Sequence, residues 1–328
     1  MSAQNTRILA ADPAGIAEAA RLILAGEAVA VPTETVYGLA ADATNAEAVA
    51  KIYAAKGRPA FNPLIVHVLD LAAAERIGAI DAAARALAER WWPGPLTLVV
   101  PLRVDAGLAP AVTAGLVTVA LRCAAHPVIQ ALLRAAGRPL AAPSANASGT
   151  ISPTSADHVM KSLAGRIPLI LDGGPSERGL ESTIAKVEAG ALQVLRPGPI
   201  DLADLQNSPP CKGGAGGGSA EGGRNAEQEI IEAPGQMPSH YAPAKPLRLD
   251  AAAAEPGEWL IGFGAIEGDH NLSPSANLDE AAAALFAALH RADASPRPRI
   301  AVAPVPAEGI GAAINDRLRR AAAPRETG

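Results

Sequence analysis

Two basic residues, Lys56 and Arg58, stand two positions apart on a turn that Pro59 stiffens. Such a pair can clamp phosphate oxygens, because arginine presents a planar fork of donors and lysine a compact charge. A loop between prolines and a glycine carries Ser144 and Asn146, whose hydroxyl and amide groups could wrap a nucleotide or bind metal-bound phosphate. Taken alone, the first pair is more often surface charge, and the second cluster is more often turn chemistry.

Other polar residues follow predicted strands, which is where open α/β sheets bind ligands. Thr33-Glu34-Thr35 comes directly after a strand that ends at Pro32, and its hydroxyls and carboxylate could hold a zwitterionic amino acid. Thr118 and Arg122 are four positions apart and therefore share one face of a strand. His67, inside another predicted strand, is the only general-base candidate by type, and substrate binding suits it better.

Several catalytic motifs do not occur in the sequence. There is no GxxxxGK[ST] phosphate loop, so any use of ATP is of another kind. HExxH, GxSxG and paired carboxylates are also missing, and the lack of paired carboxylates argues against glycosidase chemistry. Cys123 and Cys211 form no CxxC pair and no cluster with zinc spacing, so no metal ligand is assigned. Cys123 is expected in the core, and both thiols fit a reducing cytoplasm.

The composition is that of an ordinary globular protein, with 49% hydrophobic and 19% charged residues over a length of 328. A formal net charge of -5 argues against a surface that coats nucleic acid, so no stable nucleic-acid binding is expected. The sequence has no run of 18 apolar residues and no signal-peptide pattern at its start. We therefore expect no membrane segment and a cytoplasmic location.

Strand and helix patterns alternate up to about residue 206, which is typical of an α/β fold with a mixed sheet. The predicted strands are 28–31, 64–68, 96–100, 117–121, 139–142, 169–171, 182–187 and 192–195. The predicted helices are 13–26, 45–55, 70–77, 81–92, 127–136 and 154–163. The helix over 45–55 delivers Lys56 and Arg58 at its end, and the strand over 139–142 runs into the Ser144 loop.

A glycine-rich stretch around residues 213–218 cannot bury a core and predicts a flexible linker. Beyond the linker, patterns for two strands and two helices predict a small second α/β domain. Those strands are expected at 259–263 and 300–304, and the helices at 278–291 and 309–321. The predicted domains are residues 1–206 and 247–328, joined by the linker and a polar interdomain segment over 207–246.

Eight motifs in order resemble the threonylcarbamoyl-AMP synthases, which have the YrdC-like fold. The motifs are PTETVYGL, KGRP, NPLIVHV, PGPLT, VALR, APSANASG, ESTI and LRPG, and the resemblance covers roughly residues 8–206. The segment from Ser239 to Pro243 is similar to the interdomain segment of the long, two-domain form. The resemblance implies a twisted mixed sheet with flanking helices, followed by a small Rossmann-like accessory domain.

The resemblance also implies roles for individual residues. A lysine, an arginine, a serine and an asparagine line a basic catalytic cavity in this family, and they match Lys56, Arg58, Ser144 and Asn146. The residues that match ATP contacts are Arg58, Asn62, Thr118, Ser144, Ser152 and Arg196, with Tyr241 as a lid. The residues that match L-threonine contacts are Thr35, His67, Arg122, Ser182 and the backbone at Ala142.

The implied reaction joins L-threonine, bicarbonate (or CO2) and ATP into threonylcarbamoyl-AMP, with Mg2+ accompanying ATP. The product would pass to a tRNA threonylcarbamoyl-transferase. One alternative is a carbamoyl-transfer domain of the hydrogenase-maturation type, which would bring zinc-finger-like cysteine pairs that this chain lacks. Another is an RNA-binding or ribosome-associated module, against which the net charge and the lack of an aromatic and basic surface pattern argue.

Overall fold

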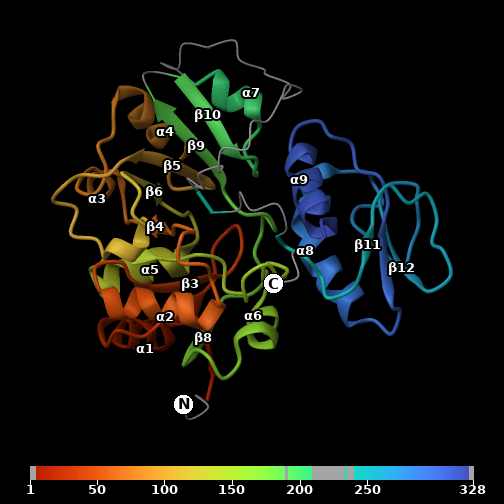
Figure 1. Ribbon diagram of the computed structural model, residues 1–328, viewed down its shortest axis with the longest axis horizontal. Helices are drawn as coiled ribbons and strands as arrows, with labels where there is room; N and C mark the ends of the chain where they lie inside the picture. Colours follow the sequence, from red (N-terminus) through yellow and green to blue (C-terminus); the bar gives the residue numbers. More distant parts are fainter. Residues whose placement is uncertain (1–4, 189–190, 209–232, 235–239, 325–328) are drawn as a thin grey trace.

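The computed structural model describes residues 5–188, 191–208, 233–234 and 240–324, and these form two α/β domains (Figure 1). The larger domain holds a ten-stranded sheet and the smaller domain a four-stranded sheet. Helices α8 (Leu278–Ala294) and α9 (Gly311–Ala322) of the smaller domain lie between its own strands and the larger domain (Figure 1). The predicted fold class is confirmed.

The sheet of the larger domain is mixed. Its strands are β1 (Arg7–Ala10), β2 (Val29–Val31), β3 (Gly38–Asp42), β4 (Ile65–His67), β5 (Leu96–Pro101), β6 (Thr118–Arg122), β7 (Leu140–Ala141), β8 (Leu169–Asp172), β9 (Thr183–Glu188) and β10 (Ala191–Arg196). Their order is β1-β8-β2-β3-β7-β4-β6-β5-β9-β10. The pairs β1/β8, β2/β8, β4/β6 and β5/β9 are parallel, and the others are antiparallel.

The helices of the larger domain lie at the predicted places, except the last of them, which the sequence pattern did not predict. They are α1 (Pro13–Leu24), α2 (Ala46–Lys56), α3 (Leu71–Glu75), α4 (Ala82–Trp91), α5 (Pro127–Ala136), α6 (Ala156–Leu163) and α7 (Leu202–Gln206), with a 3-10 turn at Pro110–Val112. The smaller domain contains β11 (Leu247–Arg248), β12 (Glu258–Gly262), β13 (His270–Asn271) and β14 (Arg299–Val302) besides α8 and α9. Its strands are all parallel, in the order β11-β14-β12-β13, as a Rossmann-like domain requires.

The ends of α2 determine where the first basic motif lies. The Asn45 side chain accepts hydrogen bonds from the backbone N–H groups of Glu47 and Ala48, which caps the helix start. Gly57 ends the helix in the left-handed conformation, with φ of 59°. Lys56 therefore stays on the last helical turn, whereas Arg58 leaves the helix in a new direction.

The sequence pattern misses β3, which follows the polar loop of Thr33–Thr35. The five residues of β3 lack β-branched side chains, so propensity gives no signal for a strand. All five are buried, because β3 lies in the middle of the sheet between β2 and β7. Several elements are too short to give a sequence signal, and their strands form only because neighbouring strands supply hydrogen-bond partners. These elements are β1, β7, β11, β13 and α7, of which only β7 was predicted.

Some expectations concern residues outside the described ranges, namely the glycine-rich linker, Cys211 and residues 235–239 of the interdomain segment. Cys123 is 2% exposed and belongs to the main hydrophobic core, as predicted. Among the described helices, none is long and apolar enough to cross a bilayer. The limits of the domains stay a prediction.

The two domains share a hydrophobic core. The core of the smaller domain takes in Val36, Ile151 and Leu180 of the larger one. Gly179 has a φ of 66°, and a Cβ atom there would lie 2.5 Å from backbone atoms of Ala283 in α8, so only glycine fits this approach. The loops around Ile151 and Leu180 are therefore built directly against the accessory domain.

Two stacked histidines also join the domains. The rings of His158 and His290 lie 3.8 Å apart, and His290 Nε2 lies 3.1 Å from the carbonyl oxygen of Ser152. Burial is the main cause that lowers the pKa of His158 to about 4 and that of His290 to about 3. Both imidazoles are therefore neutral at physiological pH, which allows them to stack without charge repulsion.

This pair predicts a pH-dependent stability. In the folded protein the pKa values of both histidines lie below the ordinary value of about 6.5. Their contribution to the free energy of unfolding is therefore complete above that pH. It falls as the pH drops towards 4, because the unfolded histidines bind protons first. Urea unfolding at about pH 7.5 and about pH 5 measures the fall in the free energy of unfolding between the two pH values. In the double variant His158→Gln/His290→Gln this fall should be smaller than in wild type by about 1–2 kcal/mol, a value that is reduced for the partial exposure of His158. An equal loss in both proteins would contradict this.

Candidate active site

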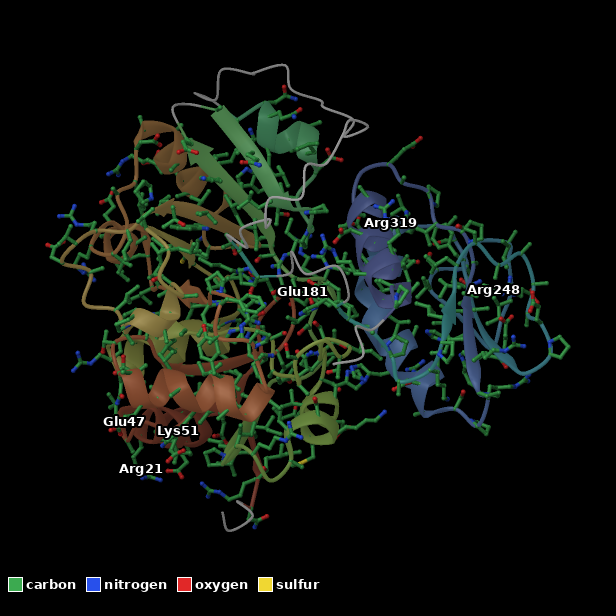
Figure 2. All side chains as sticks on the ribbon, in the orientation of Figure 1. Arg21, Glu47, Lys51, Glu181, Arg248 and Arg319 are labelled. Carbon is green, nitrogen blue, oxygen red and sulfur yellow. The ribbon has the colours of Figure 1, made fainter. Side chains whose placement is uncertain are left out.

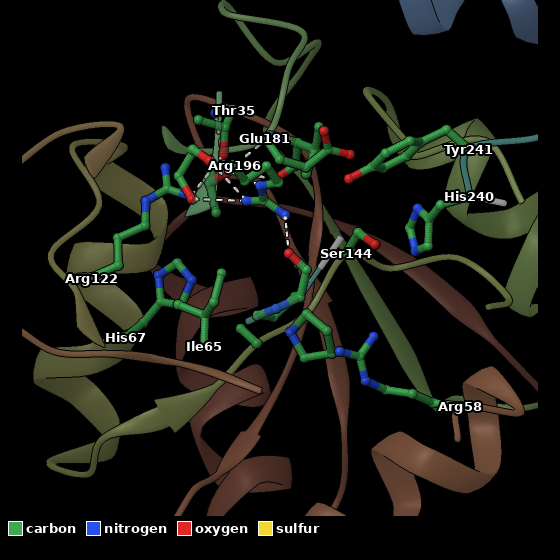
Figure 3. Close-up of a pocket in the computed structure, with 17 residues that line it drawn as sticks. Thr35, Arg58, Ile65, His67, Arg122, Ser144, Glu181, Arg196, His240 and Tyr241 are labelled. Carbon is green, nitrogen blue, oxygen red and sulfur yellow. Dashed lines mark hydrogen bonds between the residues drawn. The ribbon is translucent and has the colours of Figure 1, made fainter. Parts of the chain in front are cut away.

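One pocket gathers most of the predicted site residues at the strand ends of the larger domain (Figure 3). Its lining residues are Thr33, Thr35, Val36, Gly38, Arg58, Ile65, His67, Arg122, Ala142, Pro143, Ser144, Glu181, Ser182, Arg196, Pro234, His240 and Tyr241. In Figure 3, Arg122 and His67 lie at one end, and His240 and Tyr241 lie at the other. The open space is about 40 Å³, enough for a few water molecules but not for a nucleotide.

Arg58 and Arg196 bring two buried positive charges to this pocket. Arg58 donates to the Asn62 carbonyl oxygen, to Asn62 Oδ1 at 2.6 Å and to the Pro63 carbonyl oxygen at 2.7 Å. Arg196 donates to the Ser182 carbonyl oxygen and to the Pro234 carbonyl oxygen, at 2.9 Å and 3.3 Å. These acceptors are neutral, so within the described chain neither guanidinium has a carboxylate partner.

Lys56 adds a buried amino group behind the pocket wall. Its Nζ donates to the carbonyl oxygens of Ser144 and Asn146, at 2.5 Å and 2.6 Å. Burial, and then the charge of Arg58, hold the pKa of Lys56 well below its ordinary value. Burial likewise lowers the pKa of Arg58 to about 10 and lowers that of Arg196. Burial thus disfavours the charged forms of these basic groups, and an anionic ligand would stabilise them.

The Ser144 loop is held from several sides. Asn146 Nδ2 donates to the carbonyl oxygens of Ala147 and Thr150, while Asn146 Oδ1 is buried and has no donor among the described residues. Ser144 lines the pocket, whereas Asn146 and Lys56 lie behind it. Of the four residues predicted as catalytic, the structure therefore places Ser144 and Arg58 on the wall and the other two in its support.

At the opposite end, Arg122 is held by an acid and a hydroxyl. Its NH2 lies 2.6 Å from Glu34 Oε1 and its NH1 lies 2.9 Å from Thr35 Oγ1, with all three residues buried. The charge of Arg122 outweighs the raising effect of burial and lowers the pKa of Glu34. Glu34 Oε2 has no hydrogen-bond donor among the described side chains and backbone groups. Arg122 lines the pocket, whereas Glu34 is outside the lining. This end therefore presents a guanidinium, which suits the carboxylate of an amino acid.

His67 lies beside Arg122, since the two are partners across β4 and β6. Burial, and then the charge of Arg122, lower the pKa of His67 to about 3. The imidazole is therefore neutral and can exchange hydrogen bonds, but it is a weak base in this state. Its Nδ1 is buried without a partner in the described part of the chain, which suits a residue that binds a ligand.

Glu181 and Ser182 line the pocket from one loop, and Ser152 supports Glu181 from another. Ser182 Oγ lies 2.7 Å from Thr97 Oγ1 and also accepts from Arg196 NH2. Ser152 does not line the pocket itself, but its Oγ donates to Glu181 Oε1 at 2.5 Å, and Glu181 does line it. Gly198 allows the LRPG turn to approach this loop, because a Cβ there would lie 2.4 Å from Thr183 N.

Besides Ser152, two more predicted ATP contacts, Asn62 and Thr118, do not reach the pocket wall. Asn62 is buried and holds Arg58 through its side-chain oxygen. Thr118 begins β6, while Arg122 ends it, so the shared face that the spacing predicts is present but only the Arg122 end meets the pocket. On that face Ala120 forms an apolar patch with Ile65 and Ala233, the last of which belongs to the interdomain segment.

Tyr241 closes the end of the pocket opposite Arg122. It is 1% exposed, has a φ of 63° and packs edge-to-face on His240 at 4.1 Å between ring centroids. On its other side it contacts Phe286 of α8, at 5.7 Å between centroids. Its hydroxyl has no hydrogen-bond partner among the described residues. A buried aromatic ring with a spare hydroxyl, in a strained backbone conformation, is consistent with the predicted lid.

Sequence reasoning gave no individual role to Glu181, His240 and Pro234, although each lines the pocket. Thr33, which was predicted only as part of the Thr33–Thr35 loop, lines it too. Thr33 and Glu181 stand inside the quoted motifs and could have been found there, and His240 directly precedes the predicted lid residue. Pro234 carries no chemical signal, since it contributes a backbone carbonyl that only folding brings to Arg196.

The chain resembles known proteins over nearly its whole length. A family model described as telomere recombination matches residues 21–198, and one described as threonylcarbamoyl-AMP synthase, C-terminal domain, matches residues 200–323. The threonylcarbamoyl-AMP synthase of Bacillus subtilis is 41% identical over 94% of this chain and 93% of its own, and that of Pyrococcus abyssi is 38% identical over 92% of each.

A solved structure gives the same answer. Sua5 of P. abyssi, complexed with L-threonine, aligns with a TM-score of 0.82 over 97% of each chain, at 34% identity. The agreement includes both domains, so neither the hydrogenase-maturation alternative nor the RNA-binding alternative is needed. The two family models, the curated relatives and the two-domain match together show that this chain belongs to the threonylcarbamoyl-AMP synthase family.

Proposed function

We propose that the pocket joins L-threonine, bicarbonate and ATP into threonylcarbamoyl-AMP. The observation that carries this assignment is the charge pattern along the pocket. Arg58 and Arg196 are buried guanidinium groups on the wall that donate to neutral oxygens, which suits a triphosphate. Arg122 at the other end, which Glu34 holds from outside the lining, suits the carboxylate of an amino acid. The related Sua5 of P. abyssi was solved in complex with L-threonine, which supports this proposal.

At the nucleotide end, Arg58 and Arg196 would bind phosphate oxygens, with Ser144 and Ser152 adding hydroxyl donors. Lys56 would act through the Ser144 loop, and Asn62 through Arg58. A nucleotide base that displaced Ala233 would lie on the apolar patch of Ile65 and Ala120, two positions along β6 from Thr118. That displacement would explain how Thr118 contributes to ATP binding although it lies off the present wall.

At the amino-acid end, Arg122 would bind the threonine carboxylate, and this requires it to release Glu34. Thr35, Ser182 and neutral His67 would bind the remaining polar groups of threonine, along with the backbone at Ala142. The Ala142 N–H donates to the Ile65 carbonyl oxygen, at 2.9 Å, so the Ala142 carbonyl would be the backbone group that contacts threonine. Together these contacts would place the threonine amine towards the phosphates.

The chemistry needs positioning more than proton transfer. The threonine nitrogen forms a bond to the carbon of bicarbonate, water leaves, and a carbamate results. A carbamate oxygen then bonds to the α-phosphorus of ATP in line, and the bond to the β-phosphate oxygen breaks to release pyrophosphate. Buried cations stabilise the charge that develops on the phosphates, and a closed pocket protects the carbamate from water.

Mg2+ would enter with ATP and neutralise phosphate charge. Among the described residues, Glu181 is the only carboxylate on the pocket wall, and its oxygens accept hydrogen bonds from Ser152 and Arg317. No group of three or more His, Cys, Asp or Glu residues is arranged for a metal in the described part of the chain. The residues thus fit a metal held chiefly by the triphosphate, with Glu181 and Ser144 nearby, and not a preformed metal cage.

The interdomain segment would act as a lid, because Tyr241 and Ala233 occupy space that a nucleotide needs. The reaction would take place in the cytoplasm, where Cys123 stays a free thiol. The product would then be consumed by a transferase that modifies tRNA, without stable tRNA binding by this chain.

The test is pyrophosphate release from ATP, measured with purified protein. Release should require both L-threonine and bicarbonate, and the product should have the mass of threonylcarbamoyl-AMP. Release that is independent of threonine would refute the assignment. Tight, salt-sensitive tRNA binding without ATP would favour a nucleic-acid module instead.

Arg122 should determine the affinity for threonine. In Arg122→Lys, loss of the planar fork should raise the KM for L-threonine about 100-fold, while the KM for ATP changes less than about threefold. Steady-state kinetics with each substrate varied in turn measures this. Arg134→Lys, an exposed change on α5, serves as the control. Equal effects on both KM values would show that Arg122 does not discriminate the amino-acid end.

A further inference from the structure

Arg317, on α9 of the accessory domain, is completely buried at the domain junction, with an exposed fraction of 0%. Its Nε lies 2.9 Å from Glu181 Oε2, and its NH1 donates to the carbonyl oxygen of Pro197 at 2.9 Å. Its guanidinium carbon lies 5.3 Å from the ring centroid of Tyr241. Figure 2 shows Glu181 at this junction, between the larger domain and α9.

These contacts connect Arg317 to both sides of the nucleotide end. Glu181 lines the pocket, and its second oxygen accepts the short hydrogen bond from Ser152, a predicted ATP contact. Tyr241 lines the same pocket and is the predicted lid. A single side chain of the accessory domain therefore contacts one wall residue and the lid residue at once.

The geometry of arginine makes this contact directional. The guanidinium is planar and rigid, so a hydrogen bond to Glu181 and a stacking contact with Tyr241 fix the positions of both partners. Burial alone would lower the pKa of Arg317, but Tyr241, Glu181 and Asp316 raise it, so the residue remains charged. The Arg317 NH2 group and the Tyr241 hydroxyl are both buried without hydrogen-bond partners among the described residues.

Arg317 also balances the charge of Glu181. Without Arg317, Glu181 would be a buried carboxylate with no ion-pair partner among the described residues, and its negative charge would repel phosphates bound nearby. Arg317 supplies the compensating cation from behind, which leaves Arg58 and Arg196 available for the substrate. Asp316, 2.8 Å from Arg317, offsets the remaining charge on the accessory-domain side.

We propose that Arg317 is a positioning residue for the nucleotide end of the active site, through which the accessory domain holds Glu181 and Tyr241 in place. This inference rests on the proposed function for the identity of the nucleotide. The accessory domain would therefore form part of the active site, because Arg317 is the only described residue that forms an ion pair with Glu181.

The experiment compares Arg317→Met with Arg319→Met in the full-length chain. Arg319 lies on the same helix but is exposed, so it controls for the loss of a positive charge. Binding of a non-hydrolysable ATP analogue and of L-threonine is measured separately by calorimetry. Arg317→Met should weaken analogue binding about 30-fold and change threonine binding less than about threefold. Arg319→Met should match wild type in both.

A second pair of variants separates positioning from folding. Arg317→Lys keeps the charge and should recover part of the analogue affinity, and Glu181→Gln should weaken analogue binding as Arg317→Met does. In the double variant the two effects should overlap and not multiply. Unchanged analogue affinity in a folded Arg317→Met or Glu181→Gln protein would overturn the proposal, as would an equal loss for both ligands. Because binding is read without turnover, failure of the pyrophosphate assay in wild type would count against the proposed function alone.

Discussion

Arg58→Ala should reduce threonine-dependent pyrophosphate release by about 1000-fold or more. Arg58 is buried on the pocket wall, and each described acceptor of its guanidinium is a neutral oxygen. Its loss removes a preorganised cation from the position where phosphate charge develops. The Asn62 side chain would also lose its anchor, so the loop between α2 and β4 would become less fixed.

Arg58→Lys separates charge from geometry. It should retain a fraction of the activity, because an ammonium supplies charge but not the planar fork. The measurement is kcat/KM for ATP at saturating threonine and bicarbonate. Arg166→Ala is a matched control, since that guanidinium also bonds a backbone carbonyl but lies outside the pocket. Activity within about tenfold of wild type in Arg58→Ala would contradict the assigned role.

Lys56→Met should lose activity to a similar extent and should also lower the free energy of unfolding by about 2–4 kcal/mol. Methionine keeps the length of the side chain but leaves the carbonyl oxygens of Ser144 and Asn146 without their buried donor. The two effects together would identify Lys56 as the residue that holds the Ser144 loop in its reactive shape.

The combination of the two measurements is decisive for Lys56. A lysine that only clamped phosphate would be a buried charge whose removal leaves the free enzyme equally stable or more stable. Lys51→Met, on the exposed face of the same helix, is the control, because Lys51 forms only a surface ion pair with Glu27 (Figure 2). Lost activity with unchanged stability would restore direct phosphate contact as the role of Lys56.

Much of the fold was accessible from local patterns. Helix α2 begins at its asparagine cap and ends at Gly57 within a residue of the prediction, because capping and left-handed glycine are local effects. Strand β3 was not accessible, since its Ala and Gly residues take a strand conformation only through pairing with β2 and β7. The mixed sheet follows from alternation of elements, but the strand order does not.

The sequence by itself determined the family, because eight short motifs in a fixed order carry the side chains of one reaction. It did not determine how those side chains work together. Folding decided that Arg58 and Ser144 form the wall while Lys56 and Asn146 support it, and that Arg122 is held by Glu34. Folding also brought Arg317 to Glu181 from 136 positions away. Local spacing contains no information about such contacts, since they depend on how two separate cores pack together.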